Sequence, residues 1–271
     1  MKVIHWMSWC CLGLIGCIGQ IAAQPLDDIV DRKILQERSI LAYPPLREAD
    51  LFWEKRVWRV IDLREKMNQA FRYPVEPFFN ILREAAEQGE ITLYSTENDR
   101  FTMPMDAAEL QQMLYKVDTI EVFHPVTLEP QLRVIQEEIN WESITRFRIK
   151  EQWFFETATS TLRVRILGIA PIIEVRDDQG NFRHERPLFW AYYPELRPVL
   201  AKRKVFHPNN DQHPISWEDQ LERRFFSSYI YKQSNVQDDR LEATYSGLDL
   251  LLEADKIKQE IFNFEHDLWS Y

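Results

Sequence analysis

Cysteine is almost absent from the chain, and its few copies lie near one end. The 271 residues include three cysteines, Cys10, Cys11 and Cys17, all within the first 24 residues. A chain that begins after this segment has no thiol for a disulfide framework or for a cysteine nucleophile. Its stability must then come from a hydrophobic core, and about 248 residues are enough to build one.

Glycine is also scarce in the part of the chain that would fold. Only four glycines follow the first 24 residues, Gly89, Gly168, Gly180 and Gly247, and no two of them are close in sequence. A phosphate-binding loop needs several glycines within a few residues, and the serine elbow of a hydrolase needs glycines on both sides of its nucleophile. Both kinds of site are therefore excluded.

Positive charge is in deficit. The chain has 33 lysines and arginines against 43 aspartates and glutamates, which gives a formal net charge of −10. Such an excess of carboxylates repels the phosphate backbone of nucleic acids and anionic lipid, so neither is an expected partner. The 45% hydrophobic and 13% aromatic content is too high for a disordered chain. The composition therefore indicates a globular protein.

Long apolar runs are absent after the first segment, and a membrane span would need about 20 apolar residues. Lys2 precedes an apolar run from Met7 to Ala23, which is the pattern of a secretory signal peptide. We predict that residues 1–23 are a signal peptide cleaved between Ala23 and Gln24, and that the protein is exported. The sequence LIGC also fits a lipoprotein cleavage box at Cys17, but apolar residues follow it where a lipid anchor normally precedes a polar linker.

The pattern after this segment predicts an arm and one domain. In residues 24–45, Ile29, Leu35 and Ile40 are spaced among charged residues before the sequence YPP, which indicates a helical or loosely ordered N-terminal arm. Residues 46–271 suit a single α+β domain in length and pattern.

Alternation of apolar and polar residues is concentrated in the middle third of the chain. It runs from about Ser143 to Tyr193 and includes DDQGN, which has the composition of a hairpin turn. We predict an antiparallel meander sheet over this range, packed with N- and C-terminal helices. The helices are expected at Phe78 to Gly89, Asp106 to Leu114, Ser216 to about Tyr231, and Leu248 to Trp269.

The stretch DLFWEKRVWRVIDLREKMN, residues 50–68, fits neither a helix nor a strand cleanly. In a helix Trp58 would fall on the charged side, and in a strand it would share a face with Val60 and Asp62. Its nearly balanced charges suit protein contacts or internal ion pairs better than a nucleic-acid or lipid surface. We expect the exposed members of a set of five residues to form a partner interface: Trp53, Trp58, Arg59, Asp62 and Arg64.

The residues leave two other kinds of site open. His207, Asp211 and His213 could surround a metal ion in a secreted hydrolase, but no HExxH or other metal signature completes them. A surface loop explains the same composition. Seven tryptophans follow the first 24 residues, and exposed ones could stack on carbohydrate, although most are expected in the core. No catalytic, cofactor-binding or metal-binding residue is predicted.

Several blocks of sequence, taken in order, resemble one known family. They are WEKRVWRVIDLREKMN (53–68), EQWFFE (151–156), RILGIAP (165–171), LFWAYYPELR (188–197), SSYIYKQSN (227–235) and KIKQEIFNFEHDLW (256–269). This set resembles the GldN/PorN proteins, which are gliding-motility and type IX secretion components of the Bacteroidota. The resemblance covers nearly all of the chain after residue 24.

The resemblance implies a periplasmic, non-enzymatic subunit associated with the inner face of the outer membrane. Such proteins form ring assemblies with a partner lipoprotein, GldK/PorK, and contact the periplasmic part of the motor protein GldM/PorM. The system exports proteins that carry a C-terminal signal, and it can power gliding. The lipid anchor belongs to the partner in this family, which favours cleavage before Gln24 over lipidation of Cys17. The resemblance implies no catalytic residue and no cofactor.

Overall fold

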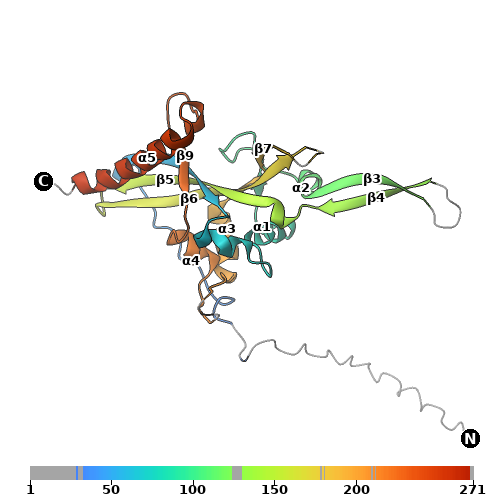
Figure 1. Cartoon of the computed structure of the whole chain (residues 1–271). Helices are drawn as coiled ribbons and strands as arrows, with labels where there is room; N and C mark the ends of the chain where they lie inside the picture. The colour runs from blue at the N-terminus through green and yellow to red at the C-terminus, as the bar shows by residue number, and fades with distance from the viewer. Residues whose placement is uncertain are drawn as a thin grey trace, which may run out of the picture. The chain divides into compact units, whose positions relative to one another are not determined.

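The computed structural model describes residues 29, 33–123, 130–177, 179, 181–208, 210 and 212–268. The chain divides into two compact units, Met1–Lys33 and Ile34–Tyr271, and every helix and strand below belongs to the second. Within that unit, antiparallel strands form a sheet on which helices pack (Figure 1). The predicted α+β class is confirmed.

The main sheet of the described residues has seven strands, all paired antiparallel. Its order is β2-β8-β6-β5-β1-β9, and β7 pairs with the C-terminal part of β6. The range predicted as a meander holds four of these strands, of which the first three pair in chain order and the fourth pairs back with β6: β5 (Ile144–Glu156), β6 (Thr161–Arg176), β7 (Phe182–Pro187) and β8 (Trp190–Tyr192). Segments outside it supply the other three: β1 (Leu51–Asp62), β2 (Leu93–Tyr94) and β9 (Tyr229–Gln233).

Strand β1 is the tryptophan-containing stretch that fitted neither helix nor strand. It lies between β5 and β9, so from Val57 to Val60 it is paired on both edges. Val57 and Ile61 point to one face of the sheet, and Trp58 and Val60 point to the other, as alternation in a strand requires. Because both faces are covered, all residues from Val57 to Asp62 are buried.

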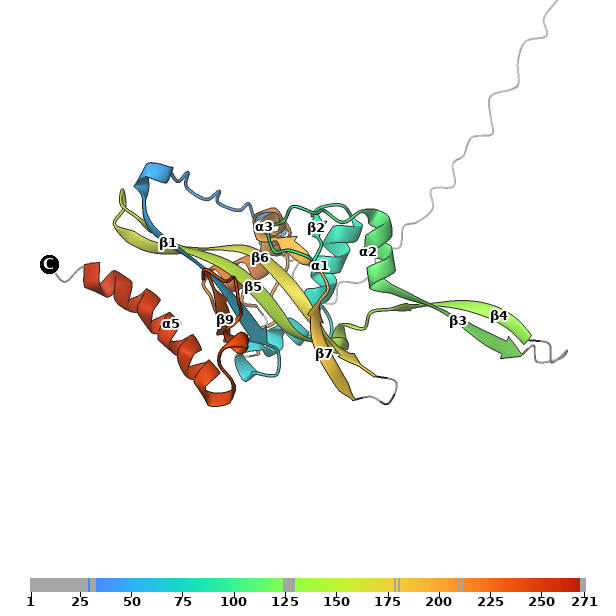
Figure 2. The same cartoon turned by 90° about the horizontal axis from the view of Figure 1, so that it is seen from above.

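Two groups of helices cover the face that carries Val57 and Ile61. Three helices form the larger core with Ile61: α1 (Phe78–Glu87), α3 (Tyr193–Lys202) and α4 (Trp217–Glu222). The long helix α5 (Gly247–Leu268) packs Ala254, Ile257 and Ile261 against Val57 and Ile230 further along the same face. Figure 2 shows α5 beside β9, which it contacts.

Aromatic residues and cations cover the opposite face. Trp58 packs with Trp190 and Tyr231, and the ammonium groups of Lys150 and Lys232 lie 5.5 and 4.7 Å from the centre of its ring. Such cation–π contacts are stronger when the cation is withdrawn from water, and Lys150 is 4% exposed. Burial lowers the pKa of Lys150, against the opposing effect of Asp99.

A second sheet of two strands follows helix α2 (Ala107–Leu114), which begins at a capping box made by Asp106 and Glu109. Strands β3 (Tyr115–Phe123) and β4 (Pro130–Glu138) pair in register over their whole length (Figure 1). Among the described residues, neither strand pairs with the main sheet. The alternation that predicted the central meander did not extend to this hairpin, so the fold has a sheet that was not expected.

One predicted helix is shorter than expected. The capping box of Ser216 and Asp219 starts α4 as predicted, but the helix ends at Glu222 and not near Tyr231. Arg224 has φ of 56°, a left-handed conformation that ends a helix. The following residues enter β9, because the open edge of β1 offers hydrogen-bond partners to Tyr229 through Gln233. The C-terminal helix is confirmed as α5, and Trp269 lies outside the described residues.

The described part of the arm, residues 33–45, has a turn at 34–37 and no regular helix. It is held by side chains: Arg38 donates hydrogen bonds to both carboxylate oxygens of Asp219, and Tyr43 donates one to Glu222. The guanidinium of Arg197 lies 4.1 Å from the centre of the Tyr43 ring. The arm therefore docks on α3 and α4 through ion pairs and ring contacts.

The predicted signal peptide and its cleavage between Ala23 and Gln24 fall on residues outside the described part, as does Cys17. These stay predictions. Among the described residues, none of the helices has the length and hydropathy needed to cross a bilayer.

Replacing Gly168 by alanine should destabilise the sheet. A Cβ there would lie 2.5 Å from Cζ of Phe101 and 3.2 Å from the carbonyl oxygen of Ala191, so the Phe101 ring must move away from Trp190 and Lys150. Overpacking of this kind costs about 1–3 kcal/mol, measurable as a lower urea midpoint. The double variant Gly168→Ala/Phe101→Ala should lose less stability than the sum of the losses in the two single variants. Additive losses would show that Phe101 is not the obstacle.

Asp219→Asn should release the arm at neutral pH. Hydrogen bonds from Arg38 hold the pKa of Asp219 at about 2, below its ordinary value of 3.8. A depressed carboxyl pKa stabilises docking above pH 3.8, and this contribution is lost as the pH falls towards 2. A fluorophore on Gln36→Cys should show lower anisotropy in the Asp219→Asn variant, and in the parent on acidification. The exposed Asp249→Asn is the control, and equal anisotropy in both variants would contradict the prediction.

Candidate functional site: a cationic groove under α5

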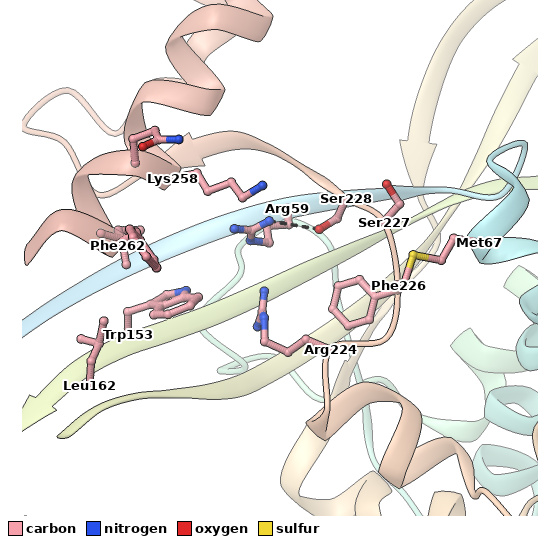
Figure 3. Close-up of a pocket in the computed structure, with 12 residues that line it drawn as sticks. Arg59, Met67, Trp153, Leu162, Arg224, Phe226, Ser227, Ser228, Lys258 and Phe262 are labelled. Carbon is pink, nitrogen blue, oxygen red and sulfur yellow. Dashed lines mark hydrogen bonds between the residues drawn. The ribbon is translucent and has the colours of Figure 1, made fainter. Parts of the chain in front are cut away.

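A groove of about 630 Å³ lies between α5, the loop after α4 and strands β1, β5 and β6 (Figure 3). It separates the two groups of helices that cover one face of the sheet. Its cationic and hydroxyl-bearing residues are Arg59, Arg224, Lys258, Ser227 and Ser228. The other lining residues are Met67, Trp153, Leu162, Phe226, Gln259, Ile261 and Phe262.

A fully buried carboxylate organises the floor of the groove. Glu151 of β5 accepts hydrogen bonds from both terminal nitrogens of Arg224, at 2.7 and 3.1 Å, and from the indole nitrogen of Trp153 at 3.1 Å. The Nε atom of Arg59 lies 3.3 Å from the same carboxylate. Glu151 thus joins strands β1 and β5 to the loop that leads into β9.

Arg59 is the more buried of the two arginines. Its residue is 6% exposed, and its Nη1 donates a hydrogen bond of 3.1 Å to the hydroxyl of Ser228 (Figure 3). Its Nε atom reaches Glu151 as an ion pair but without the geometry of a hydrogen bond. Burial lowers the pKa of Arg59, although nearby Glu151 acts in the opposite direction. A cation withdrawn from water with donors still unused attracts an anionic group.

The groove carries more positive than negative charge. Arg59, Arg224 and Lys258 line it, and the carboxylate of Glu151 pairs with the two arginines. Lys258 is exposed and, within the described part of the chain, has no ion pair. A local positive charge on a chain with a net charge of −10 attracts acidic groups selectively.

Aromatic side chains form the walls. The guanidinium of Arg224 lies 5.1 Å from the ring centre of Trp153 and 5.5 Å from that of Phe226. Phe262 on α5 and Met67 are 68% and 44% exposed. The groove therefore combines charge on its floor with accessible apolar surface beside it.

The five predicted interface residues differ in their exposure to solvent. Trp58, Arg59 and Asp62 are buried at 5%, 6% and 8% exposure, while the side chain of Arg64 is 63% exposed. Trp53 is half-buried and stacks on Phe264 of α5, with ring centres 4.5 Å apart. Trp58 is not one of the exposed members of the set, because Trp190, Tyr231 and the ammonium groups of Lys150 and Lys232 pack against it. Of the five, Arg59 lines the groove.

Asp62 is the centre of a second charged cluster. It accepts hydrogen bonds from Arg64 and from Arg146, which also pairs with Glu185 of β7. The hydrogen bonds from Arg64, the largest cause, hold the pKa of Asp62 at about 2. This cluster fixes the exposed guanidinium of Arg64 where β1 ends.

The geometry gives little support to the metal site or to the carbohydrate-binding site that the sequence left open. The rings of His207 and His213 lie 5.5 Å apart, and Asp211 is outside the described residues. No group of three or more metal-ligating residues forms within the described part. The described tryptophans are all buried or half-buried, so the described surface lacks the row of exposed indoles that carbohydrate stacking needs.

Sequence reasoning missed Glu151 and Arg224. Glu151 stands between Ile149 and Trp153 at the spacing of a single strand face, and a charge in phase with core residues signals a buried ion pair. Arg224 had no comparable signal, because it lies 73 residues away in a segment predicted as helix.

A comparison with known protein families matches one family to most of the chain. Residues 46–270 match the family described as "Gliding motility associated protein GldN". The chain therefore belongs to the GldN family, and the resemblance read from the sequence is confirmed. The family is a component of the gliding-motility and type IX secretion machinery of the cell envelope and is not known as an enzyme family. No curated protein sequence matches the chain.

Glu151→Gln should strongly destabilise the protein. The substitution keeps the size of the side chain but leaves Arg59 and Arg224 without a counter-charge, and an uncompensated buried charge costs about 3–5 kcal/mol. Urea unfolding should report this loss. The matched change Glu54→Gln, at an exposed glutamate on neighbouring β1, should cost less than about 0.5 kcal/mol. Similar midpoints for the two variants would contradict the role given to Glu151.

Proposed function

We propose that the protein is a non-enzymatic structural subunit of the type IX secretion and gliding-motility machinery. In this proposal it forms a periplasmic ring with an outer-membrane lipoprotein like GldK/PorK and contacts a motor protein like GldM/PorM. The observation that carries the proposal is the family match, which runs through the whole described fold from residue 46 onward. The expected signal peptide supports the periplasmic location, and the lipoprotein would hold the ring at the inner face of the outer membrane.

Exposed apolar side chains on α5 are consistent with a subunit that assembles. Leu248, Leu251 and Leu252 are 70%, 54% and 59% exposed, and their spacing places them on one side of the helix. The opposite side holds Ala254, Ile257 and Ile261 in the core. Apolar residues gathered in this way at a surface favour contact with another protein. A ring needs such surfaces on every copy.

Of the residues predicted to form an interface, only the exposed or partly exposed ones can contact a partner directly. Arg64 presents its guanidinium to solvent while Asp62 fixes its position, and Trp53 exposes part of its ring beside Phe264. A side chain already held in one conformation loses less entropy on binding. Trp58, Arg59 and Asp62 would then support this interface from within the fold.

The proposal is tested by co-expressing the chain with a GldK/PorK-like lipoprotein. Size-exclusion chromatography should show both proteins in one large assembly. Arg64→Ala should weaken this co-elution, because it removes the exposed guanidinium and leaves Asp62 paired with Arg146. Arg47→Ala, at another exposed arginine, is the control. Separate elution of the wild-type proteins would refute the ring, and unchanged co-elution of Arg64→Ala would refute the interface alone.

A further inference from the structure

We propose that the cationic groove under α5 binds an acidic peptide segment of a partner protein. The segment would place a carboxylate against Arg59 and Lys258, with an aromatic or aliphatic side chain next to it. This inference concerns the isolated chain and does not depend on ring assembly. It assigns a ligand class to a site that the family match leaves without a role.

The charge of the groove selects a negative group. Glu151 already accepts two hydrogen bonds from Arg224 and lies fully buried behind the arginines. Arg59 contributes a second guanidinium, which forms an ion pair with Glu151 through Nε at 3.3 Å and donates a hydrogen bond from Nη1 to the neutral hydroxyl of Ser228, so that two arginines share one carboxylate. Lys258 adds a third cation from α5. A carboxylate entering here meets donors that the buried glutamate does not saturate, and charge-assisted hydrogen bonds are the strong ones.

The walls favour a peptide over a free inorganic anion. Trp153 and Phe226 flank Arg224, and the exposed ring of Phe262 stands on the α5 side. A small anion would leave this apolar surface in water. In a peptide with an acidic residue beside an apolar one, the carboxylate would pair with the cations of the floor and the apolar side chain would pack on the aromatic wall. The volume of about 630 Å³ is in the range that holds a few side chains.

The floor disfavours a fatty acyl chain. An acyl chain needs a continuous apolar surface, whereas Arg59, Arg224 and the hydroxyls of Ser227 and Ser228 interrupt this one. Covering these groups with hydrocarbon would leave polar atoms without partners, which is costly. A peptide offers backbone carbonyls and amides for the same groups.

The first step of the test is a selection of peptides from a random twelve-residue display library on the purified protein. Enriched sequences should contain aspartate or glutamate next to an aromatic or aliphatic residue. The enriched peptide is then synthesised with a fluorescent label, and its binding is followed by anisotropy. Replacing its acidic residues by glutamine should abolish binding, and raising the salt concentration should weaken binding because ion pairs are screened.

Variants on α5 locate the site without disturbing the buried cluster. Lys258→Glu should weaken binding about tenfold or more, because a cation is replaced by a repelling charge. Lys256→Glu is the matched control. It makes the same charge change on the same helix, at a residue that pairs with Glu253 and does not line the groove. This variant should bind the peptide with the same affinity as the parent.

Several results would overturn the proposal. The first is a set of selected peptides that is not enriched in aspartate or glutamate. The second is a Lys258→Glu variant that binds the peptide as tightly as the parent does. The third is a Lys256→Glu variant that loses as much affinity for the peptide as Lys258→Glu does. Binding of laurate or of inorganic phosphate to the groove, measured directly, with no peptide binding would assign the site to a lipid or to an anion. Because the measurement uses the isolated chain, a failed ring assembly with intact peptide binding would refute the proposed function alone.

Discussion

The buried carboxylate of Glu151 is the interaction on which this arrangement depends. It lies where the two hydrophobic clusters on one face of the sheet meet, and it receives Arg59 from β1 and Arg224 from the loop after α4. That loop leads directly into β9, which closes the edge of β1 and supports α5. A charge inside a protein is tolerated only when partners and hydrogen bonds surround it. The cluster therefore fixes the path of the chain between the two groups of helices.

Burial of both faces at the centre of the sheet, around residues 57–62 of β1, limits where this protein can meet others. Helices cover one face, and Trp58 is covered on the other by Lys150, Lys232 and the segment that carries Phe101. Contact surfaces are then available on helix exteriors, at strand ends such as Arg64, in the groove between the helices, and at exposed rings on the strands such as Phe52 of β1 and Phe182 of β7. Many aromatic side chains pack inside the described fold, whereas the leucines at the start of α5 and several phenylalanines, among them Phe52, Phe182, Phe225 and Phe262, are exposed.

The elements that sequence predicted well are those with a long local period. The alternation between Ser143 and Tyr193 gave the meander, and the spacing after Leu248 gave α5, because each pattern is repeated over many residues. The segment after Glu222 was misjudged, since the pairing of Tyr229 with the edge of β1 overrides a short helical pattern. Glu151 could have been identified from its phase between Ile149 and Trp153, but its partner Arg224 could not.

The amino-acid sequence by itself determined the α+β class, the family, and the scarcity of thiols and glycines that excludes several catalytic sites. Each of these follows from composition, local period or ordered blocks of residues. Only the tertiary structure decided that Trp58 is interior and Arg64 exterior, that Asp219 holds the arm, and that Arg59, Arg224 and Lys258 share one groove. The physical reason is that burial and ion pairing depend on residues far apart in the chain, and no local pattern records which of them meet.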